Sequence, residues 1–220
     1  MRTLQRKTLN RYSARFKKFG ECIESIGWRN KEQQLARFQA LIEIDDLRGK
    51  SILDVGCGFA DLYAFLKEKE IDVEYTGFEI FPKFAEIAKK RHPECNIEIK
   101  DIFEEKPAQQ YDFVFISGLF NKNMPDNDKY VKVFLEKAFE ICKQGVAANM
   151  MSSYVDYKDK ELHYYTPEEV FVMCRKISKR IALRHDFMPF EFAVFLYKNQ
   201  ERLSKSLVFK EFYKRVEAKK

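Results

Sequence analysis

Three carboxylic acids lie in or at the end of short apolar segments in the first half of this 220-residue sequence: Asp54, Glu79 and Asp101. Asp54 belongs to the apolar run 52–55, which is typical of a buried strand, and Gly56 and Gly58 follow it directly. Glycines allow the backbone to come close to a ligand. The strand, the glycine turn and the helix that starts near Asp61 therefore predict a nucleotide-binding loop.

The acidic residues around this turn help to decide which nucleotide fits. A dinucleotide fingerprint, G-x-G-x-x-G, has its third glycine where this sequence has Asp61. Carboxylates at Asp54 and Asp61 would repel a pyrophosphate. They suit a ligand that is adenosine-like at one end and cationic at the other, with no phosphate. S-adenosylmethionine (SAM), which carries a sulfonium and an ammonium group, has this chemistry.

The turn resembles the glycine motif of class I SAM-dependent methyltransferases, acidic-x-G-x-G-x-G. Asp54, Gly56 and Gly58 match that motif, and Ala60 stands in place of the third glycine. We expect Ala60 to be a small departure, provided that its backbone does not need a positive φ. The alternative interpretation is an α/β turn without a ligand, in which Asp61 is an ordinary helix N-cap.

The resemblance implies which residues bind the cofactor. Glu79, about 20 residues beyond the glycines, would accept hydrogen bonds from the ribose hydroxyls. Asp101 would bind the adenine amino group, with Ile80 and Ile102 against the two faces of the ring. The residues expected to bind SAM in this domain, with S-adenosylhomocysteine (SAH) as the product, are Asp54, Gly56, Cys57, Gly58, Asp61, Glu79, Ile80, Asp101, Ile102, Ser117 and Gly118.

Strand and helix patterns alternate from 51 to about 151, which is typical of a parallel, doubly wound sheet. Segments 181–187 and 191–197 predict a terminal hairpin. We therefore expect an α/β fold with a mostly parallel seven-stranded sheet, a C-terminal antiparallel hairpin strand and an N-terminal helical extension. The expected division is 1–49 as a helical extension or lid, 50–198 as the SAM-binding methyltransferase domain, and 199–220 as a basic helical tail.

Composition favours a globular protein, with 45% hydrophobic and 15% aromatic residues and no apolar run long enough for a membrane span. Its 5 cysteines lack C-x-x-C spacing, which predicts reduced thiols and a cytoplasmic location. We expect no metal site, because no metal-ligand spacing is present.

Positive charge is concentrated at the two ends of the chain. The formal net charge is +6. Residues 1–20 hold seven basic and no acidic side chains, and residues 198–220 carry a balance of +5, which leaves the body at −6. These ends could bind an anionic partner, or they could be solvated helices.

The methyl acceptor should lie at the segment that follows the strand 111–117. That segment lacks the D/N-P-P-Y/F and Pro-Cys motifs of nucleic-acid methyltransferases, which disfavours a nucleic-acid acceptor. Segments outside the core should cover the pocket. Tyr12, Gln34 and Arg37 are expected at the methionine end of SAM, with Arg37 or Gln34 at its carboxylate. The expected acceptor-binding residues are Trp28, Phe120, Tyr154 and Tyr165.

Among the three histidines, His163 is the candidate general base, because it lies in the loop on the substrate side. Its alternative is an ordinary polar surface side chain. Three hypotheses for function follow. The first is a SAM-dependent methyltransferase that acts on O or N of a small molecule. The others are an RNA (tRNA) methyltransferase that uses its basic ends, and a non-catalytic protein that binds SAM and a partner.

Overall fold

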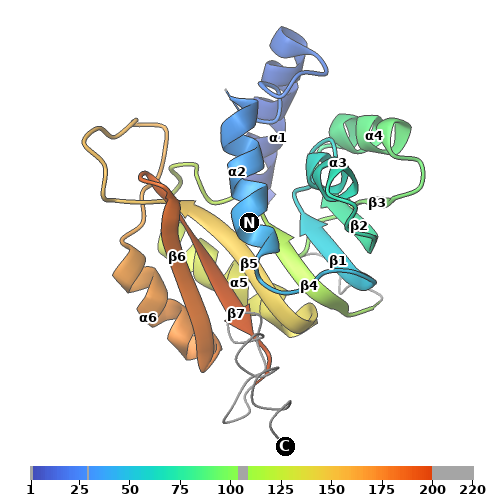
Figure 1. The fold of residues 1–220 in the computed structure, drawn as a ribbon. Helices are drawn as coiled ribbons and strands as arrows, with labels where there is room; N and C mark the ends of the chain where they lie inside the picture. The colour runs from blue at the N-terminus through green and yellow to red at the C-terminus, as the bar shows by residue number, and fades with distance from the viewer. Residues whose placement is uncertain (1, 29, 104–108, 200–220) are drawn as a thin grey trace, which may run out of the picture.

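The computed structural model describes residues 2–28, 30–103 and 109–199 (Figure 1). The elements follow in the order α1 (Arg2–Phe19), α2 (Lys31–Ile42), β1 (Lys50–Val55), α3 (Asp61–Glu68), β2 (Val73–Glu79), α4 (Pro82–Arg91), β3 (Asn96–Ile99), β4 (Tyr111–Ile116), α5 (Asn127–Ile141), β5 (Cys142–Met151), α6 (Pro167–Ile177), β6 (Arg180–Met188) and β7 (Glu191–Tyr197).

The strands form one seven-stranded sheet in the order β3-β2-β1-β4-β5-β7-β6. Strands β1 to β5 pair in parallel, whereas β7 is antiparallel to both β5 and β6. The predicted fold class is therefore confirmed. Strand order reverses between β1 and β4, and ligands bind at such a switch point, outside the carboxyl ends of the strands.

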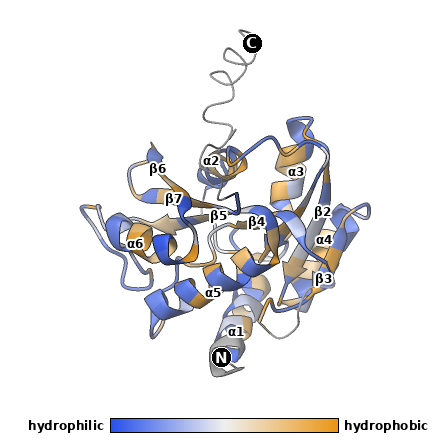
Figure 2. Ribbon diagram, turned by 90° about the horizontal axis from the view of Figure 1, so that it is seen from below, coloured by the Kyte–Doolittle hydropathy of each residue, from blue (hydrophilic) through white to orange (hydrophobic). Residues whose placement is uncertain are grey.

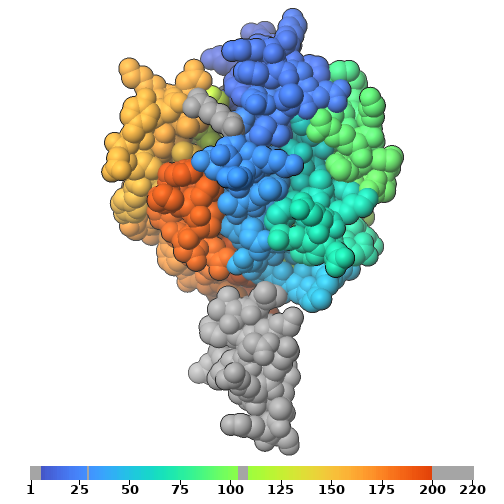
Figure 3. All heavy atoms as spheres, turned by 45° about the horizontal axis from the view of Figure 1, so that its top comes forward, coloured from blue at the N-terminus to red at the C-terminus, as the bar shows by residue number. Residues whose placement is uncertain are grey.

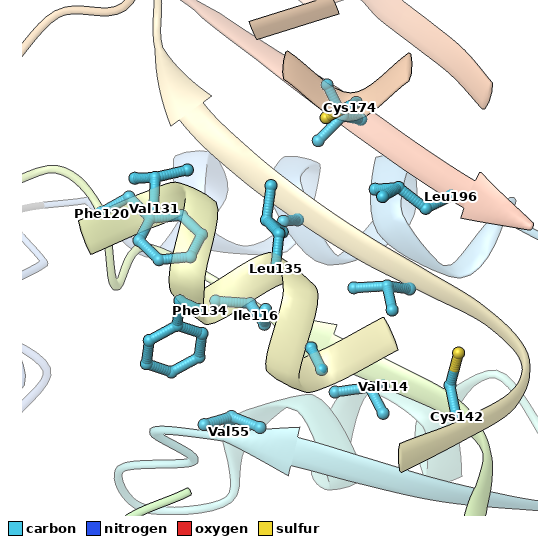
Figure 4. Packing of buried hydrophobic residues seen from close by; sticks show 14 of the residues in the cluster. Val55, Val114, Ile116, Phe120, Val131, Phe134, Leu135, Cys142, Cys174 and Leu196 are labelled. Carbon is cyan, nitrogen blue, oxygen red and sulfur yellow. The ribbon is translucent and has the colours of Figure 1, made fainter. Parts of the chain in front are cut away.

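Helices cover both faces of the sheet. On one face α5 and α6 pack on the sheet through one apolar cluster, part of which is shown in Figure 4, where Val131 and Leu135 of α5 lie near Ile116 of β4. On the other face α2, α3 and α4 contribute Phe38, Leu66 and other apolar side chains to a second cluster. Helices α3 to α6 each carry hydrophobic and hydrophilic residues, as helices between a core and water do (Figure 2).

The N-terminal residues divide into two parts with different roles. Helix α2 begins after Asn30, whose side chain accepts from the Gln33 N–H, and it belongs to the layer on the sheet. Helix α1 ends at Phe19, and Gly20 follows it with φ +64°. In Figure 3 the N-terminal residues (blue) lie between the segment that follows β5 (orange) and helices α3 and α4.

Other boundaries differ by a few residues from the expected ones. Strand β4 ends at Ile116, one residue before the expected end at 117, and β6 spans Arg180–Met188 instead of 181–187. Helix α6 starts at Pro167, and its N-cap residue Thr166 makes no side-chain capping bond. The predicted tail lies, except for its first residue, outside the described residues. In the described part of the chain, no helix combines the length and apolar character needed to cross a bilayer.

Candidate active site

The turn after β1 brings backbone close to the switch point. Gly56 and Gly58 have φ values of +77° and +58°, the region that glycine adopts without cost. Ala60 also has a positive φ, +62°, so our condition for a small departure from the glycine motif is not met. A side chain in this conformation costs about 1–2 kcal/mol. Ala60 occupies the N-cap position of α3, and Asp61 is therefore its first helical residue rather than its cap.

Asp54 lies beneath this turn with only 4% of its surface exposed. Its Oδ2 accepts a 2.7 Å hydrogen bond from the hydroxyl of Tyr75. Burial, with a smaller contribution from the nearby charges of Glu79 and Asp61, raises the pKa of Asp54 to about 7, and the Tyr75 bond opposes this rise. A cation placed beside Asp54 would favour its ionised form.

Glu79 reaches the same turn from the end of β2. Its Oε2 accepts from the Gly58 N–H at 2.9 Å and its Oε1 from the Phe81 N–H at 2.8 Å. Burial raises the pKa of Glu79, and these backbone bonds oppose that rise. Each carboxylate oxygen keeps a second lone pair, which a pair of ribose hydroxyls can use.

These side chains line one crevice of about 110 Å³ at the carboxyl edge of the sheet. Asp101, whose Oδ1 accepts from the Phe103 N–H, lies at this crevice with Ile80 and Ile102. The structure brings together here the predicted residues Tyr12, Trp28, Gln34, Asp54, Gly56, Cys57, Gly58, Asp61, Glu79, Ile80, Asp101, Ile102, Ser117 and Gly118. Sequence reasoning missed its other walls, among them Thr8, Ile26, Leu119 and Tyr130.

The crevice has the chemistry that a cationic adenosine donor needs. Four carboxylates line it, from Asp54, Asp61, Glu79 and Asp101. Ser117 Oγ is buried there without a hydrogen-bond partner among the described residues. Gln34 donates to Asp61 Oδ2 at 3.1 Å and keeps a second N–H for a ligand carboxylate. The residues present therefore fit SAM better than a ligand with a pyrophosphate.

Arg37 differs from the expectation, because it does not line this crevice. Its Nε donates to Glu191 Oε2 at 2.6 Å, and the pair is buried with 4% and 0% of the side chains exposed. Its guanidinium also lies over the ring of Trp28, 4.6 Å from the ring centre. Asn149 connects this pair to the switch point, donating to Glu191 and accepting from the Gly118 N–H. Buried polar residues inside apolar strands are the one sequence signal that could have found Asn149 and Glu191.

Three of the predicted acceptor residues do not line the crevice. Phe120 and Tyr165 are buried in the core, where the Tyr165 hydroxyl donates to the Phe120 carbonyl at 3.0 Å. Tyr154 is 58% exposed, and its hydroxyl donates to Glu168. Trp28 alone of this group lines the crevice. The polar loop 152–165 has no apolar period from which these orientations could have been read.

The candidate base His163 also lies away from the crevice. Its ring is 4.4 Å from that of Tyr165, edge to face, and its Nε2 is 3.9 Å from Asp128 Oδ1. Burial lowers the pKa of His163, and Asp128 opposes this effect. The side chain is not among those that line the crevice or the two cavities beside it.

Two cavities adjoin the crevice, and they share Arg11, Tyr12 and Lys122 with each other. One, of about 480 Å³, shares Ile80 and Asp101 with it. The other, of about 260 Å³, shares Trp28 and Gly118 with it. We call this second one the basic cavity, because it is lined by Arg11, Arg15, Arg37 and Lys122.

The fold and the site together define an α/β protein that binds an adenosine-based ligand at its switch point. Comparison with known proteins is consistent with this. Residues 53–147 match the sequence model of a methyltransferase domain family. A Mycobacterium tuberculosis protein named as a methyltransferase is 28% identical over 155 residues, which cover 67% of this chain and 93% of that protein.

Two further proteins are similar over different lengths. The malonyl-[acyl-carrier protein] O-methyltransferase of Acetivibrio thermocellus is 38% identical over 85 residues, 36% of this chain and 30% of that enzyme. The SAH-bound magnesium protoporphyrin IX methyltransferase of Synechocystis has the same fold, with a TM-score of 0.64 at 11% identity, covering 88% of this chain and 100% of that one. The chain is a SAM-dependent methyltransferase whose cofactor is SAM, and its fold is the one that the Synechocystis enzyme has.

Proposed function

We propose that this methyltransferase acts on O or N of a small-molecule acceptor that binds in the basic cavity. The observation that carries the proposal is the contact between two spaces: the basic cavity and the cofactor crevice share Trp28 and Gly118 as walls. Support also comes from the names of similar proteins, because magnesium protoporphyrin IX is a small molecule and the Acetivibrio relative is an O-methyltransferase.

The chain's residues have distinct roles in this proposal. Glu79 holds the ribose, Asp101 the adenine amino group, and Gln34 the methionine carboxylate. Asp54 and Asp61 place negative charge near the cationic end of the cofactor. When bound, SAM supplies a methyl carbon activated by its positively charged sulfur, and an acceptor lone pair takes that carbon while the carbon–sulfur electron pair stays with sulfur in SAH.

Alignment of the acceptor and exclusion of water are then the main tasks of the protein. Trp28 contributes to both in the proposal, because it separates the crevice from the basic cavity and packs on Gly118. A Cβ at Gly118 would lie 2.6 Å from ring carbons of Trp28, so the ring and the switch-point backbone are in close contact. His163 stays a candidate base only if the loop around it moves toward the crevice.

The test is release of SAH from SAM in the presence of a panel of small hydroxy, amino and carboxylic compounds. We expect SAH release with at least one compound and only background release without an acceptor. Release with tRNA and with no small molecule would contradict the proposal and favour the RNA alternative. Binding of SAM without release for any compound or for tRNA would favour a non-catalytic role.

We also propose a cytoplasmic location and the predicted division of the chain at residues 49 and 198. The location is supported by free thiols at all five cysteines: Cys22, Cys57, Cys95, Cys142 and Cys174. Detection of this protein in a disulfide-bonded form after extraction under alkylating conditions would argue against it.

A further inference from the structure

The residues that line the basic cavity indicate the chemical class of the methyl acceptor. This inference rests on the proposed function. We propose that the acceptor is a small organic acid whose anionic group binds between Arg11 and Arg37. The cavity meets the crevice at Trp28 and Gly118, whereas Ile80 and Asp101, the adenine side, border the other cavity. It is therefore the space next to the methionine end of the cofactor.

Charge in the cavity favours an anion. Among the residues that the structure describes, four basic side chains line it against two acidic ones, Asp159 and Glu161. One of the basic side chains, Lys122, is paired with Glu161 at 3.0 Å. A cleft with an excess of one charge raises the local concentration of ligands of the opposite charge.

Two guanidinium groups on these walls have unsatisfied donors. Arg37 is 4% exposed, and its Nη1 has no hydrogen-bond partner within the described part of the chain, although Nε and Nη2 contact Glu191. The Nε of Arg11 is likewise buried and without a partner there. A buried donor without a partner costs about 1–3 kcal/mol. The oxygens of an acid group, such as a carboxylate, accept from guanidinium donors in pairs, so a bound carboxylate removes this cost.

Asn121 indicates a second group that the ligand should carry. Its Oδ1, on the same walls, is buried without a partner among the residues that the structure describes. That oxygen accepts and does not donate, so it would repel the acid group itself. An O–H or N–H beside the acid group satisfies it. The acceptor class is therefore a small acid that also carries a hydroxyl, amide or amino group.

The experiment measures the binding of two acids, malonate and hexanoate, to the full chain saturated with SAH. The affinity for each acid is compared with the affinity for its neutral amide. Calorimetry gives the affinity. The fluorescence emission of Trp28, the single tryptophan in the sequence, gives a second readout, because the Arg37 guanidinium lies over its ring. We expect at least one acid to bind and to shift the emission, and its amide to bind at least about tenfold more weakly.

Variants assign the binding to these residues. Arg11→Gln should weaken acid binding by about tenfold or more while SAH binding stays within about threefold. Arg37→Ala would leave Glu191 buried without its partner and could unfold the protein. The double variant Arg37→Met with Glu191→Gln avoids this problem and should also lose acid binding. Lys17→Gln is the matched control, since it removes one charge from an exposed position of the same helix α1.

The outcomes separate this inference from the proposed function. Failure of SAH itself to bind contradicts the cofactor site and the proposed function. If SAH binds but the protein has equal affinity for an acid and its amide, only the proposal of an acid acceptor is overturned. The same holds if SAH binds and neither acid binds at about 10 mM. The acid-acceptor proposal is also overturned if Arg11→Gln and the double variant both keep the acid affinity of the unchanged protein. A large loss of SAH affinity in Arg11→Gln overturns it as well.

Discussion

Glu79 is the residue with the most direct expected role in cofactor binding. It is 4% exposed and is oriented by two backbone N–H groups. Glu79→Gln keeps the shape but removes the charge from its hydrogen bonds with ribose, and such bonds contribute about 1.5–3 kcal/mol. We expect SAH affinity measured by calorimetry to fall by roughly 10- to 100-fold.

Glu86→Gln, at an exposed position on α4, is the control for that variant and should bind SAH like the unchanged protein. An affinity of Glu79→Gln within twofold of the unchanged protein would remove Glu79 from the ribose site. Thermal unfolding of both variants checks that any loss does not come from a damaged fold.

The raised pKa of Asp54 predicts that the stability of the protein depends on pH. Its pKa is about 3.8 in the unfolded chain and about 7 when buried. Between these two values the folded state holds a proton that the unfolded state has lost. Stability without ligand therefore falls as pH rises from about 4 to 7, by at most about 1.4 kcal/mol per pH unit from this group, and levels off above 7.

Denaturant unfolding at pH 5 and pH 7.5 measures this effect. The fall in unfolding free energy should be smaller in Asp54→Asn, which cannot ionise, and whose Oδ1 can still accept from Tyr75. Equal pH dependence in the two proteins would show that the Asp54 carboxyl titrates in its ordinary range.

Sequence reasoning at the residue scale succeeded where a residue type and its position coincide. Asp54 and Glu79 lie at the carboxyl ends of β1 and β2, and Asp101 follows β3 by two residues; the carboxyl ends of parallel strands meet at one edge. It failed for Ala60, because a positive φ at a residue other than glycine has no signature in the sequence. It also failed for Arg37, whose partner Glu191 is 154 residues away.

At the scale of elements, the turn after β4 fixes how the N-terminal segment lies on the sheet. Gly118 has φ +68°, and a Cβ there would lie 2.6 Å from the Trp28 ring. Gly49 has nearly the same φ, +67°, with nothing within 4 Å of the corresponding Cβ. The two positions thus differ in steric contact and not in backbone strain.

We expect Gly118→Ala to destabilise the protein by more than Gly49→Ala. Gly49→Ala should cost about 1–2 kcal/mol from backbone strain alone. Gly118→Ala should add about 1–3 kcal/mol for the displaced ring and should change the Trp28 emission spectrum. Equal losses of unfolding free energy, with unchanged emission, would mean that Trp28 does not pack on this turn.

The order of the elements was readable from the sequence for a physical reason. Buried parallel strands are continuous apolar runs, and amphipathic helices alternate with them. The placement of α1 was not readable, since Tyr12 and Phe16 contact Phe84 through a separate small cluster rather than the main core. The loop 152–165 likewise takes its place from individual bonds, such as that of the His163 N–H to the Asn121 carbonyl.

At the scale of the whole molecule, charge distinguishes the two kinds of acceptor. The basic ends of the sequence could attract RNA, whereas the basic cavity holds its charge in a small space. For a small acceptor, we expect any affinity for bulk tRNA to be weak and to disappear with added salt. Tight tRNA binding at physiological salt, lost on removal of residues 200–220, would contradict this expectation.

Four carboxylates around the glycine turn select a cationic, phosphate-free adenosine donor in this site. Calorimetric titration of the full chain with SAM, SAH and NAD⁺ tests it most directly. We expect SAM and SAH to bind with micromolar dissociation constants, and NAD⁺ to give no measurable heat, because its pyrophosphate would face Asp54 and Asp61. Binding of NAD⁺, or binding of neither SAM nor SAH at high micromolar concentration, would contradict the claim.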